Sequence, residues 1–326
     1  MNLGLAREPE VFRWKFLEAP GGQERGPLFL LLLEGGEVAG TLGFTECPVF
    51  VQGRKLQSCA FNDWYILPRL RGKGMGDALM PHFTGRPAEV KLYFISSHPS
   101  IKASLRHGFT QLFGICEYTE YLAPLRSAVQ GGWRKLTRRG VRRRPRMSRY
   151  LERLTHLDPA IRPVSAGELG SGVLNGFLER RQQQYPFALA RDSAYLRWKY
   201  LEHPKDVGAL FALQEGLGAV QAVFALAWRC TGARDVLLLA DVYYDRKRPE
   251  DLARILRFHR QAALAAGANA RSLYTGNREL AQAAQESGMT QVYERLNGIR
   301  NDGPVALDFA ASGEWYTCGG DSDYVS

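Results

Sequence analysis

Apolar residues in this chain occur in short runs separated by turn residues, and the same order of runs occurs twice. Runs at 28–33 and 38–44 flank the turn Glu34-Gly-Gly-Glu, and runs at 209–213 and 219–226 flank a second glycine-containing turn. Two apolar runs joined by such a turn predict a β-hairpin. In both halves an apolar strand that carries an acid, a helical stretch, a further strand and a further helix follow the hairpin. The pattern predicts an α/β protein with two similarly built domains.

A direct repeat supports this division. Residues 7–20 align without a gap with residues 191–204, and the two segments share seven of fourteen positions, including Arg-Trp-Lys. A chain of 326 residues also exceeds the size at which one hydrophobic core keeps growing. We therefore predict a first domain at 1–125, a linker at 126–160 and a second domain at 161–326.

A glycine-rich segment follows the strand of the first half. After Leu67 the chain reads Pro-Arg-Leu and then Arg-Gly-Lys-Gly-Met-Gly at 71–76, before an amphipathic stretch. Glycine lets an anion approach the backbone, and a helix N-terminus offers free N–H groups, so the segment is suited to a phosphate. It is not a Walker loop, because no Ser or Thr follows Lys73, and residue 77 is Asp where a dinucleotide loop needs glycine.

The spacing Arg/Gln-x-x-Gly-x-Gly/Ala, met here by Arg71, Gly74 and Gly76, resembles motif A of the GNAT acyltransferase superfamily. In that family the loop binds the pyrophosphate of coenzyme A. The resemblance implies two GNAT-like domains, each a mixed, mainly antiparallel sheet flanked by helices, and acetyl-coenzyme A or another acyl-coenzyme A as co-substrate. A glycine-rich turn with solvated basic residues is the alternative interpretation. By resemblance, the expected cofactor-binding residues are Ile66, Leu67, Arg71, Gly72, Lys73, Gly74, Met75, Gly76 and, at the Asn position of motif B, Ser97.

The resemblance also suggests a general base. In GNAT enzymes the base, where there is one, lies on the strand before motif A, and Asp63 is on that strand. A base is needed because an alkyl ammonium, with a pKa of about 10.4, must lose a proton before it attacks a thioester. The alternative role for Asp63 is to hold a neighbouring strand or loop, since Asp241 occupies the matching position in the second half.

Other candidates for proton transfer are less well defined by the sequence. The motif B tyrosine that protonates the leaving thiolate in many relatives is replaced here by Ser104. Tyr65 and Tyr93 are the possible substitutes, although aromatic residues on strands usually belong to the core. His98, next to the motif B position, is a rival base, and because Pro99 follows it, the alternative role of His98 is to start a helix.

The second half lacks the glycine loop. Residues 245–250 read Asp-Arg-Lys-Arg-Pro-Glu at the corresponding place, without glycine and with a proline that has no N–H. We therefore expect one cofactor site, in the first half, and a degenerate second domain.

The net charge of +10 is confined to one segment. Residues 126–153 contain eleven Lys or Arg and one acid, which leaves 32 of each sign elsewhere. Arg134, Arg138 and Arg142 have the spacing of a basic stripe on a helix. A solvated linker is one interpretation and attraction to an anionic surface is the other; nucleic acid is the less favoured partner.

The remaining features indicate a cytoplasmic protein. The five cysteines are scattered without Cys-x-x-Cys spacing, no signal peptide or membrane-length apolar run is present, and the histidines lack metal-ligand spacing. We predict neither a disulfide framework nor a metal site. The glycine-rich, acidic stretch at 313–323 is expected to be a flexible tail, with docking near the active site as the alternative.

Together these features predict an acyl-coenzyme A-dependent N-acyltransferase. Acetyl is the expected acyl group and the acceptor a small-molecule or glycan amine. The Trp-Lys and Trp-Tyr motifs resemble those of acyltransferases found with envelope-polysaccharide genes, which suggests an amino sugar. One alternative is a Fem-type transferase that takes an aminoacyl group from tRNA, although such proteins usually lack an intact coenzyme A loop. The other is a coenzyme A-binding protein without catalytic activity.

Overall fold

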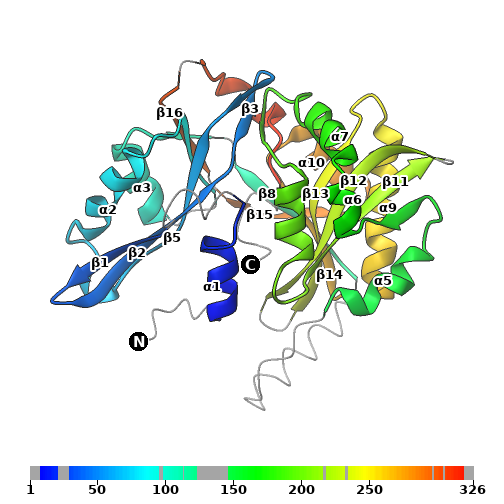
Figure 1. The fold of residues 1–326 in the computed structure, drawn as a ribbon, viewed down its shortest axis with the longest axis horizontal. Helices are drawn as coiled ribbons and strands as arrows, with labels where there is room; N and C mark the ends of the chain where they lie inside the picture. Colours follow the sequence, from blue (N-terminus) through cyan, green and yellow to red (C-terminus); the bar gives the residue numbers. More distant parts are fainter. Residues whose placement is uncertain are drawn as a thin grey trace, which may run out of the picture.

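The computed structural model describes residues 8–20, 29–94, 98–112, 114–122, 146–215, 218–231, 234–295, 297–303 and 305–318. Its strands form two large sheets side by side, with helix α1 between them (Figure 1). The basic stripe expected around Arg138, Ser97 and residues 319–326 lie outside the described residues. No helix within the described ranges is long and apolar enough to cross a membrane.

The elements follow the expected α/β pattern. The first sheet contains, in spatial order, β1 (Phe29–Glu34), β2 (Glu37–Glu46), β5 (Ser58–Ile66), β6 (Val90–Tyr93), β16 (Gly298–Asn301) and β7 (Thr110–Gln111). The second contains β15 (Thr290–Arg295), β8 (Ile115–Tyr121), β14 (Ala270–Thr275), β13 (Arg234–Tyr244), β12 (Ala219–Thr231), β11 (Gly208–Glu215) and β9 (Ile161–Pro163). A small sheet is formed by β10 (Phe187–Leu189), β3 (Val49–Val51) and β4 (Arg54–Leu56).

Helices flank both sheets. The α-helices are α1 (Pro9–Phe16), α2 (Met75–Thr84), α3 (His98–Arg106), α5 (Ser148–Thr155), α6 (Ala166–Gly170), α7 (Val173–Gln182), α8 (Ser193–Leu196), α9 (Pro249–Ala265) and α10 (Arg278–Glu286). Short helical segments are η1 (Pro68–Leu70), η2 (Arg197–Leu201) and η3 (Ala310–Glu314). The predicted fold class, mixed and mainly antiparallel sheets with helices on their faces, is confirmed.

Both predicted hairpins are present. Strand β1 pairs antiparallel with β2, and β11 pairs antiparallel with β12. In each half the next strand is then followed by a parallel partner, β5 by β6 and β13 by β14. The order of elements in the first half is therefore repeated in the second.

Each large sheet also contains one strand from the other half of the chain. Strand β8, from the first half, lies between β14 and β15, and β16, near the C-terminus, lies between β6 and β7. Neither β8 nor β16 is among the elements predicted from the apolar pattern. The division at 125 and 160 thus remains a proposal about order along the chain, whereas in space the two halves exchange strands.

The repeated Arg-Trp-Lys segments meet at the contact between the halves. The indole N–H of Trp14 donates to the carbonyl of Trp198, and the indole N–H of Trp198 donates to the carbonyl of Trp14, both at 3.0 Å. Their rings stack with centroids 4.7 Å apart. The repeat thus forms a contact that is symmetric about a pseudo-two-fold axis.

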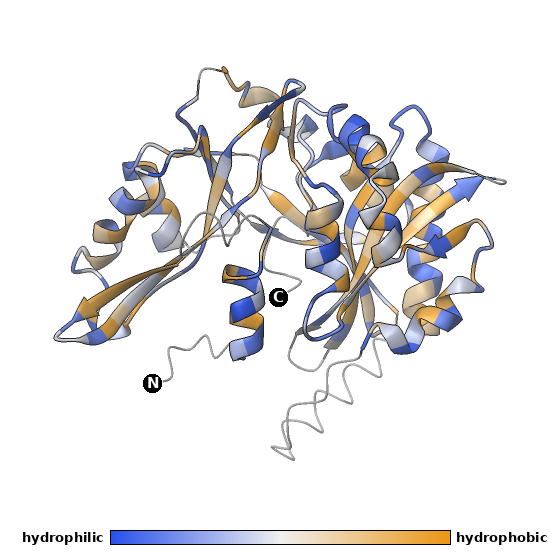
Figure 2. Cartoon of the chain, viewed as in Figure 1, coloured by the Kyte–Doolittle hydropathy of each residue, from blue (hydrophilic) through white to orange (hydrophobic). Residues whose placement is uncertain are grey.

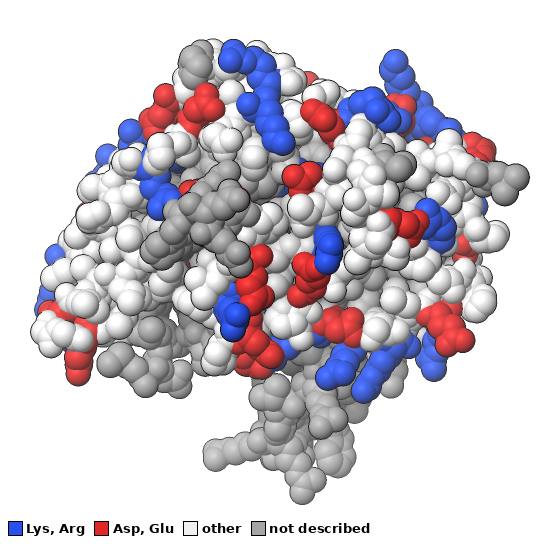
Figure 3. Space-filling model, in the orientation of Figure 1, with Lys and Arg blue, Asp and Glu red and all other residues white. Residues whose placement is uncertain are grey.

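Apolar residues, orange in Figure 2, are frequent on the strands and on one side of the helices. In the first half, rings of Phe44, Phe61, Phe83 and Phe109 contact one another between the sheet and α2. Acidic and basic side chains are interspersed on the face of the molecule shown in Figure 3.

One titratable group in the second core predicts a pH dependence of stability. His259 of α9 is fully buried, its Nε2 donates to the Leu237 carbonyl at 2.9 Å, and burial lowers its pKa to about 3. Unfolding exposes an imidazole with a pKa of about 6.5, so only the unfolded state binds a proton between these values. This contribution to stability is present above about pH 6.5 and lost as the pH falls. From pH 7 to pH 5 we expect the free energy of unfolding to fall by about 2 kcal/mol.

Urea unfolding of the wild type and of His259→Gln at the two pH values measures this term. Glutamine retains an N–H donor for Leu237 but does not titrate. An equal pH dependence in both proteins would assign the effect to other groups.

Candidate functional site

An opening in the first sheet lies beside the end of β5. The parallel pairing of β5 with β6 ends at Phe61 and Tyr93, but β5 continues to Ile66. Beyond Phe61, β5 is paired on its other side with β2. The peptide groups that face away from β2 are therefore beyond the reach of the β6 ladder and need other partners.

Asp63 lies in the part of β5 that β6 does not pair, at a β-bulge. The register between β2 and β5 shifts between Thr41 and Gly43, and Asp63 has a positive φ of 48°. Bulges turn a side chain away from the regular alternation of a strand. The Asp63 carboxylate is mostly buried and accepts a hydrogen bond from Lys15 Nζ of α1 at 2.8 Å. Asp63 is thus fixed by an ion pair with the first copy of the repeat.

The glycine-rich segment forms a tight turn into α2. Gly72 and Gly74 have φ values of 76° and 78°, while Lys73 between them is not among the described non-glycine residues with positive φ. Conformations of alternating hand turn successive N–H groups to one side, where they can bind an anion. The first helical bond runs from the N–H of Ala78 to the carbonyl of Gly74 at 3.2 Å, so the preceding amides stay outside the helix ladder.

The third glycine of the turn has a steric reason. A Cβ added at Gly76 would lie 3.1 Å from the ring of Trp64 in β5, whereas a Cβ at Gly72 or Gly74 would have no neighbour within 4 Å. The exposed side of the turn therefore has free space, and the side facing β5 is filled by an indole. The Trp64 indole N–H is buried and has no hydrogen-bond partner among the described residues.

The adjoining residues connect the turn to its surroundings. The Arg71 guanidinium donates from Nε to the Ile66 carbonyl at 3.0 Å and lies 5.4 Å from the centre of the Tyr65 ring. The N–H of Leu67 donates to the Ala39 carbonyl at 3.0 Å. Residues 65–71 are thus held against the end of β5.

Asp77, in the first turn of α2, is bonded to the end of α3. Both of its carboxylate oxygens accept hydrogen bonds from Arg106, at 2.9 and 2.8 Å, and His107 Nε2 lies 3.2 Å away. This ion pair joins the N-terminus of α2 to the C-terminus of α3.

The sequence-predicted site residues are therefore brought together only in part. Asp63, Tyr65 and residues 66–76 follow one another at the end of β5 and in the turn into α2. His98 is the first residue of α3. Ser104, at the family's tyrosine position, is buried and donates to the Ser100 carbonyl at 2.9 Å. No group of three or more potential ligands arranged for a metal ion is found among the residues that the structure describes.

Residues 5–109 match the family model described as acetyltransferase (GNAT) family. This segment of the chain is a GNAT domain. No curated protein matches the chain significantly.

Solved structures that resemble the chain carry the same fold. N-myristoyltransferase from Saccharomyces cerevisiae, with bound myristoyl-CoA and inhibitors, is 12% identical with a TM-score of 0.61, covering 90% of this chain and 72% of that one. A GCN5-related N-acetyltransferase from Anabaena variabilis is 13% identical with a TM-score of 0.56, covering 84% and 63%. A probable N-acyltransferase from Enterococcus faecalis is 12% identical with a TM-score of 0.51, covering 84% and 62%.

Two residues that contact the candidate site, Lys15 and Trp64, were not predicted from the sequence. Lys15 was visible only as part of the repeated Arg-Trp-Lys segment, and its partner Asp63 lies 48 positions further along the chain. Trp64 follows Asp63 in the strand, and its contact with Gly76 depends on how α2 packs over β5. The repeat was a usable signal for Lys15, whereas no local pattern indicates the second contact.

In the second half, the residue that matches Asp63 has a different partner. Asp241 is buried and pairs with the guanidinium of Arg191, and the Tyr200 hydroxyl also bonds to it. Lys199, the repeat counterpart of Lys15, lies instead over the rings of Trp14 and Trp198, 5.8 and 5.7 Å from their centres. The two halves therefore use different ion pairs at matching positions.

The second-half counterpart of the glycine turn is filled by its own charges. Asp245 lies 2.9 Å from Arg181, and Arg246 lies 2.7 Å from Glu279. The Lys247 amide and Arg181 hold the pKa of the Asp245 carboxyl below its ordinary value, although partial burial opposes them. A carboxylate that stays ionised here repels an anion, which agrees with a degenerate loop.

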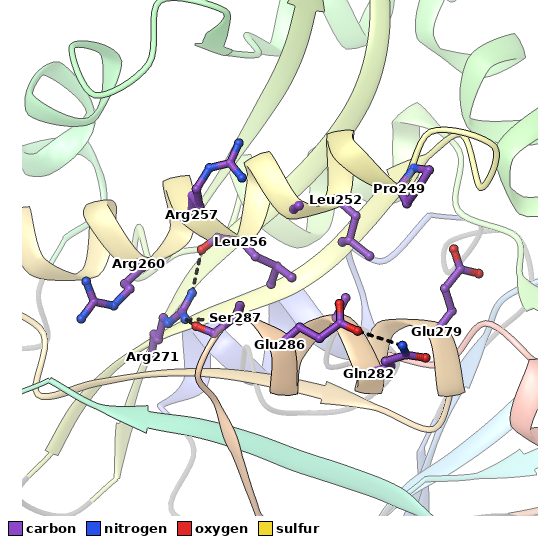
Figure 4. Close-up of a pocket in the computed structure, with 12 residues that line it drawn as sticks. Pro249, Leu252, Leu256, Arg257, Arg260, Arg271, Glu279, Gln282, Glu286 and Ser287 are labelled. Carbon is purple, nitrogen blue, oxygen red and sulfur yellow. Dashed lines mark hydrogen bonds between the residues drawn. The ribbon is translucent and has the colours of Figure 1, made fainter.

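A pocket of about 540 Å³ lies between α9 and α10 in the second half (Figure 4). Leu252 and Leu256 contribute apolar surface, and charged side chains from both helices line it, among them Arg257 and Glu286. None of its lining residues comes from the GNAT domain segment 63–76.

The C-terminal stretch differs from the expected flexible tail. Trp315, Tyr316, Thr317 and Cys318 are all buried, Trp315 in a core cluster with residues of both halves. The expectation was wrong for these residues because it was based on the glycine and acidic residues of the stretch. It neglected the two aromatic side chains, whose burial stabilises the fold. Residues 319–326 lie outside the described part of the chain.

Proposed function

We propose that the chain is an N-acyltransferase that moves an acetyl group from acetyl-coenzyme A to an amine. The observation that carries this proposal is the exposed turn of Gly72 and Gly74 at the N-terminus of α2. This turn follows the end of β5 that β6 does not pair. Backbone N–H groups at a helix N-terminus favour a phosphate anion. The GNAT family match agrees with a coenzyme A substrate.

The turn has room for the pyrophosphate of the co-substrate. The absence of neighbours within 4 Å of a Cβ at Gly72 or Gly74 supports this fit. The amides of Gly72 and of residues 74–77 would bind the phosphate oxygens, with the side chains of Lys73 and Arg71 adding positive charge. The pantetheine arm would lie along β5 beyond Phe61, where the peptide groups lack a β6 partner.

Asp63 is the proposed general base. The amine nitrogen attacks the thioester carbonyl, one of its protons passes to the Asp63 carboxylate directly or through a water, and the C–S bond breaks to release the thiolate. Lys15 would orient the carboxylate through their 2.8 Å contact. Tyr65 remains a proposed donor of a proton to the thiolate, and His98 remains the alternative base.

The packing beside the bulge favours a short acyl group. A Cβ at Gly43 would lie 2.7 Å from the Phe16 ring, and one at Gly40 would lie 2.5 Å from Ile66. Side chains already fill this side of β2, so an acetyl group fits more easily than a long acyl chain.

We further propose an amino sugar as the acceptor, an anionic surface as the partner of the basic linker 126–153, and a cytoplasmic location.

The proposal is tested by the melting temperature of the protein with acetyl-coenzyme A, coenzyme A and myristoyl-coenzyme A. A ligand that binds only the folded state adds about 2.7 kcal/mol at a concentration 100 times its Kd. We expect a clear increase with the first two ligands and a smaller one with the third. No increase with any of them would contradict a coenzyme A site. If the melting temperature does increase, thiol release with a panel of amino sugars identifies the acceptor.

A further inference from the structure

We propose that the second half retains the opening that we assign to pantetheine in the first half, and that the chain's own residues 314–318 fill it. We call these residues the C-terminal strap. The inference rests on the proposed placement of the co-substrate along β5 but concerns a different site. It assigns a peptide ligand to an opening that would otherwise be a second cofactor site.

The opening in the second sheet has the same origin as that in the first. The parallel pairing of β13 with β14 ends at Leu239 and Leu273, while β13 continues to Tyr244. A register shift also occurs between Ala225 and Leu226 of β12, opposite the end of this pairing. The tail of β13 therefore has peptide groups that β14 does not pair.

Tyr316 of the strap forms hydrogen bonds with these peptide groups. Its hydroxyl accepts a hydrogen bond from the N–H of Val242 at 2.9 Å and donates to the Val242 carbonyl at 2.7 Å. Val242 corresponds to Trp64 in the alignment of the two strands. One hydroxyl thus satisfies a donor and an acceptor, as an amide of a bound ligand would do.

The next residue of the strap is bonded to the end of β14. The Thr275 hydroxyl donates to the Thr317 carbonyl at 2.7 Å, and the N–H of Gly276 donates to the Thr317 hydroxyl at 2.9 Å. A Cβ at Gly276 would lie 2.7 Å from that hydroxyl oxygen, so the close approach requires glycine. The strap is therefore bonded to both edges of the opening.

The strap also occupies the counterpart of the proposed base. The Cys318 thiol donates to Asp241 at 2.7 Å and accepts from Arg191 at 3.0 Å. Asp241 is thus enclosed by Arg191, Tyr200 and Cys318, away from any substrate. Because the strap fills the opening and Asp241 is enclosed, the second half binds no cofactor. The chain therefore binds one equivalent of acetyl-coenzyme A.

Hydrogen exchange of the full chain tests the strap directly. Tyr316→Phe removes both bonds to Val242, and Thr317→Val removes the acceptor for Gly276. We expect the Val242 amide to exchange about tenfold faster in the first variant and the Gly276 amide about tenfold faster in the second, which corresponds to the loss of roughly one hydrogen bond. Tyr293→Phe, at a half-exposed tyrosine of β15, is the matched control and should change neither rate. Unchanged rates in both strap variants would overturn the proposal.

Titration calorimetry with acetyl-coenzyme A separates this inference from the proposed function. One equivalent per chain, with equal affinity in Tyr316→Phe, is the expected result. Two equivalents in the wild type would overturn the strap as the occupant of the second opening. Absence of binding would contradict the proposed function alone, because the exchange rates are measured without ligand.

Discussion

Replacing Gly74 by Asp is expected to lower the affinity for acetyl-coenzyme A by at least about 100-fold in a chain that still folds. The carboxylate would stand at the N-terminus of α2, where the proposed pyrophosphate lies. Two unit charges 4 Å apart near a protein surface repel by about 4 kcal/mol, and the loss of 100-fold in affinity requires about 2.7 kcal/mol. Gly74 also has a φ of 78°, which costs a side chain about 1–2 kcal/mol of stability. Calorimetric titration measures the affinity.

Gly53→Asp is the matched control for backbone strain. Gly53 has a φ of 77° in the turn between β3 and β4, and a Cβ there also has no neighbour within 4 Å. We expect both variants to lose similar stability in urea, and only Gly74→Asp to lose affinity. Equal affinity in Gly74→Asp and the wild type would exclude the turn as the phosphate site.

Local features of the fold were readable from the sequence. The hairpins and the turn at 71–76 depend on residues close together in the chain, where alternation, glycine and helix-start signals apply. The repeat was found by comparing two distant segments of the sequence. The partners of β8 and β16 were not readable, because a strand pattern specifies burial and not which sheet completes it. The exchange of these two strands is therefore a finding of the structure alone.

The candidate site shows the same division. The turn and Asp63 were identified from motif spacing, but the bulge that gives Asp63 a φ of 48° has no local glycine to mark it. The ion pair with Lys15 joins α1 to β5 and follows from the packing of distant elements. For Asp241 the sequence indicated only a shared position, whereas the structure gives it a separate partner, Arg191. Because the two acids have different ion-pair partners, the presence of Asp241 does not show that Asp63 has only a structural role.

Asp63→Asn is expected to lower kcat by about 100-fold or more, the usual contribution of a general base, while the affinity for acetyl-coenzyme A stays within about twofold. Asparagine has nearly the same shape but accepts no proton from the amine. Steady-state kinetics, together with a binding titration, measures these effects.

Lys15→Met distinguishes this role from that of a structural ion pair. Removing either partner leaves a mostly buried charge without its counter-ion, which typically costs about 3–5 kcal/mol of stability. If Asp63 serves only to bind Lys15, both single variants should lose similar activity, and the double variant Lys15→Met, Asp63→Leu should recover stability and turnover together. If Asp63 is the base, the double variant recovers stability but stays inactive. Stability from urea unfolding and kcat from thiol release therefore give different patterns for the two roles.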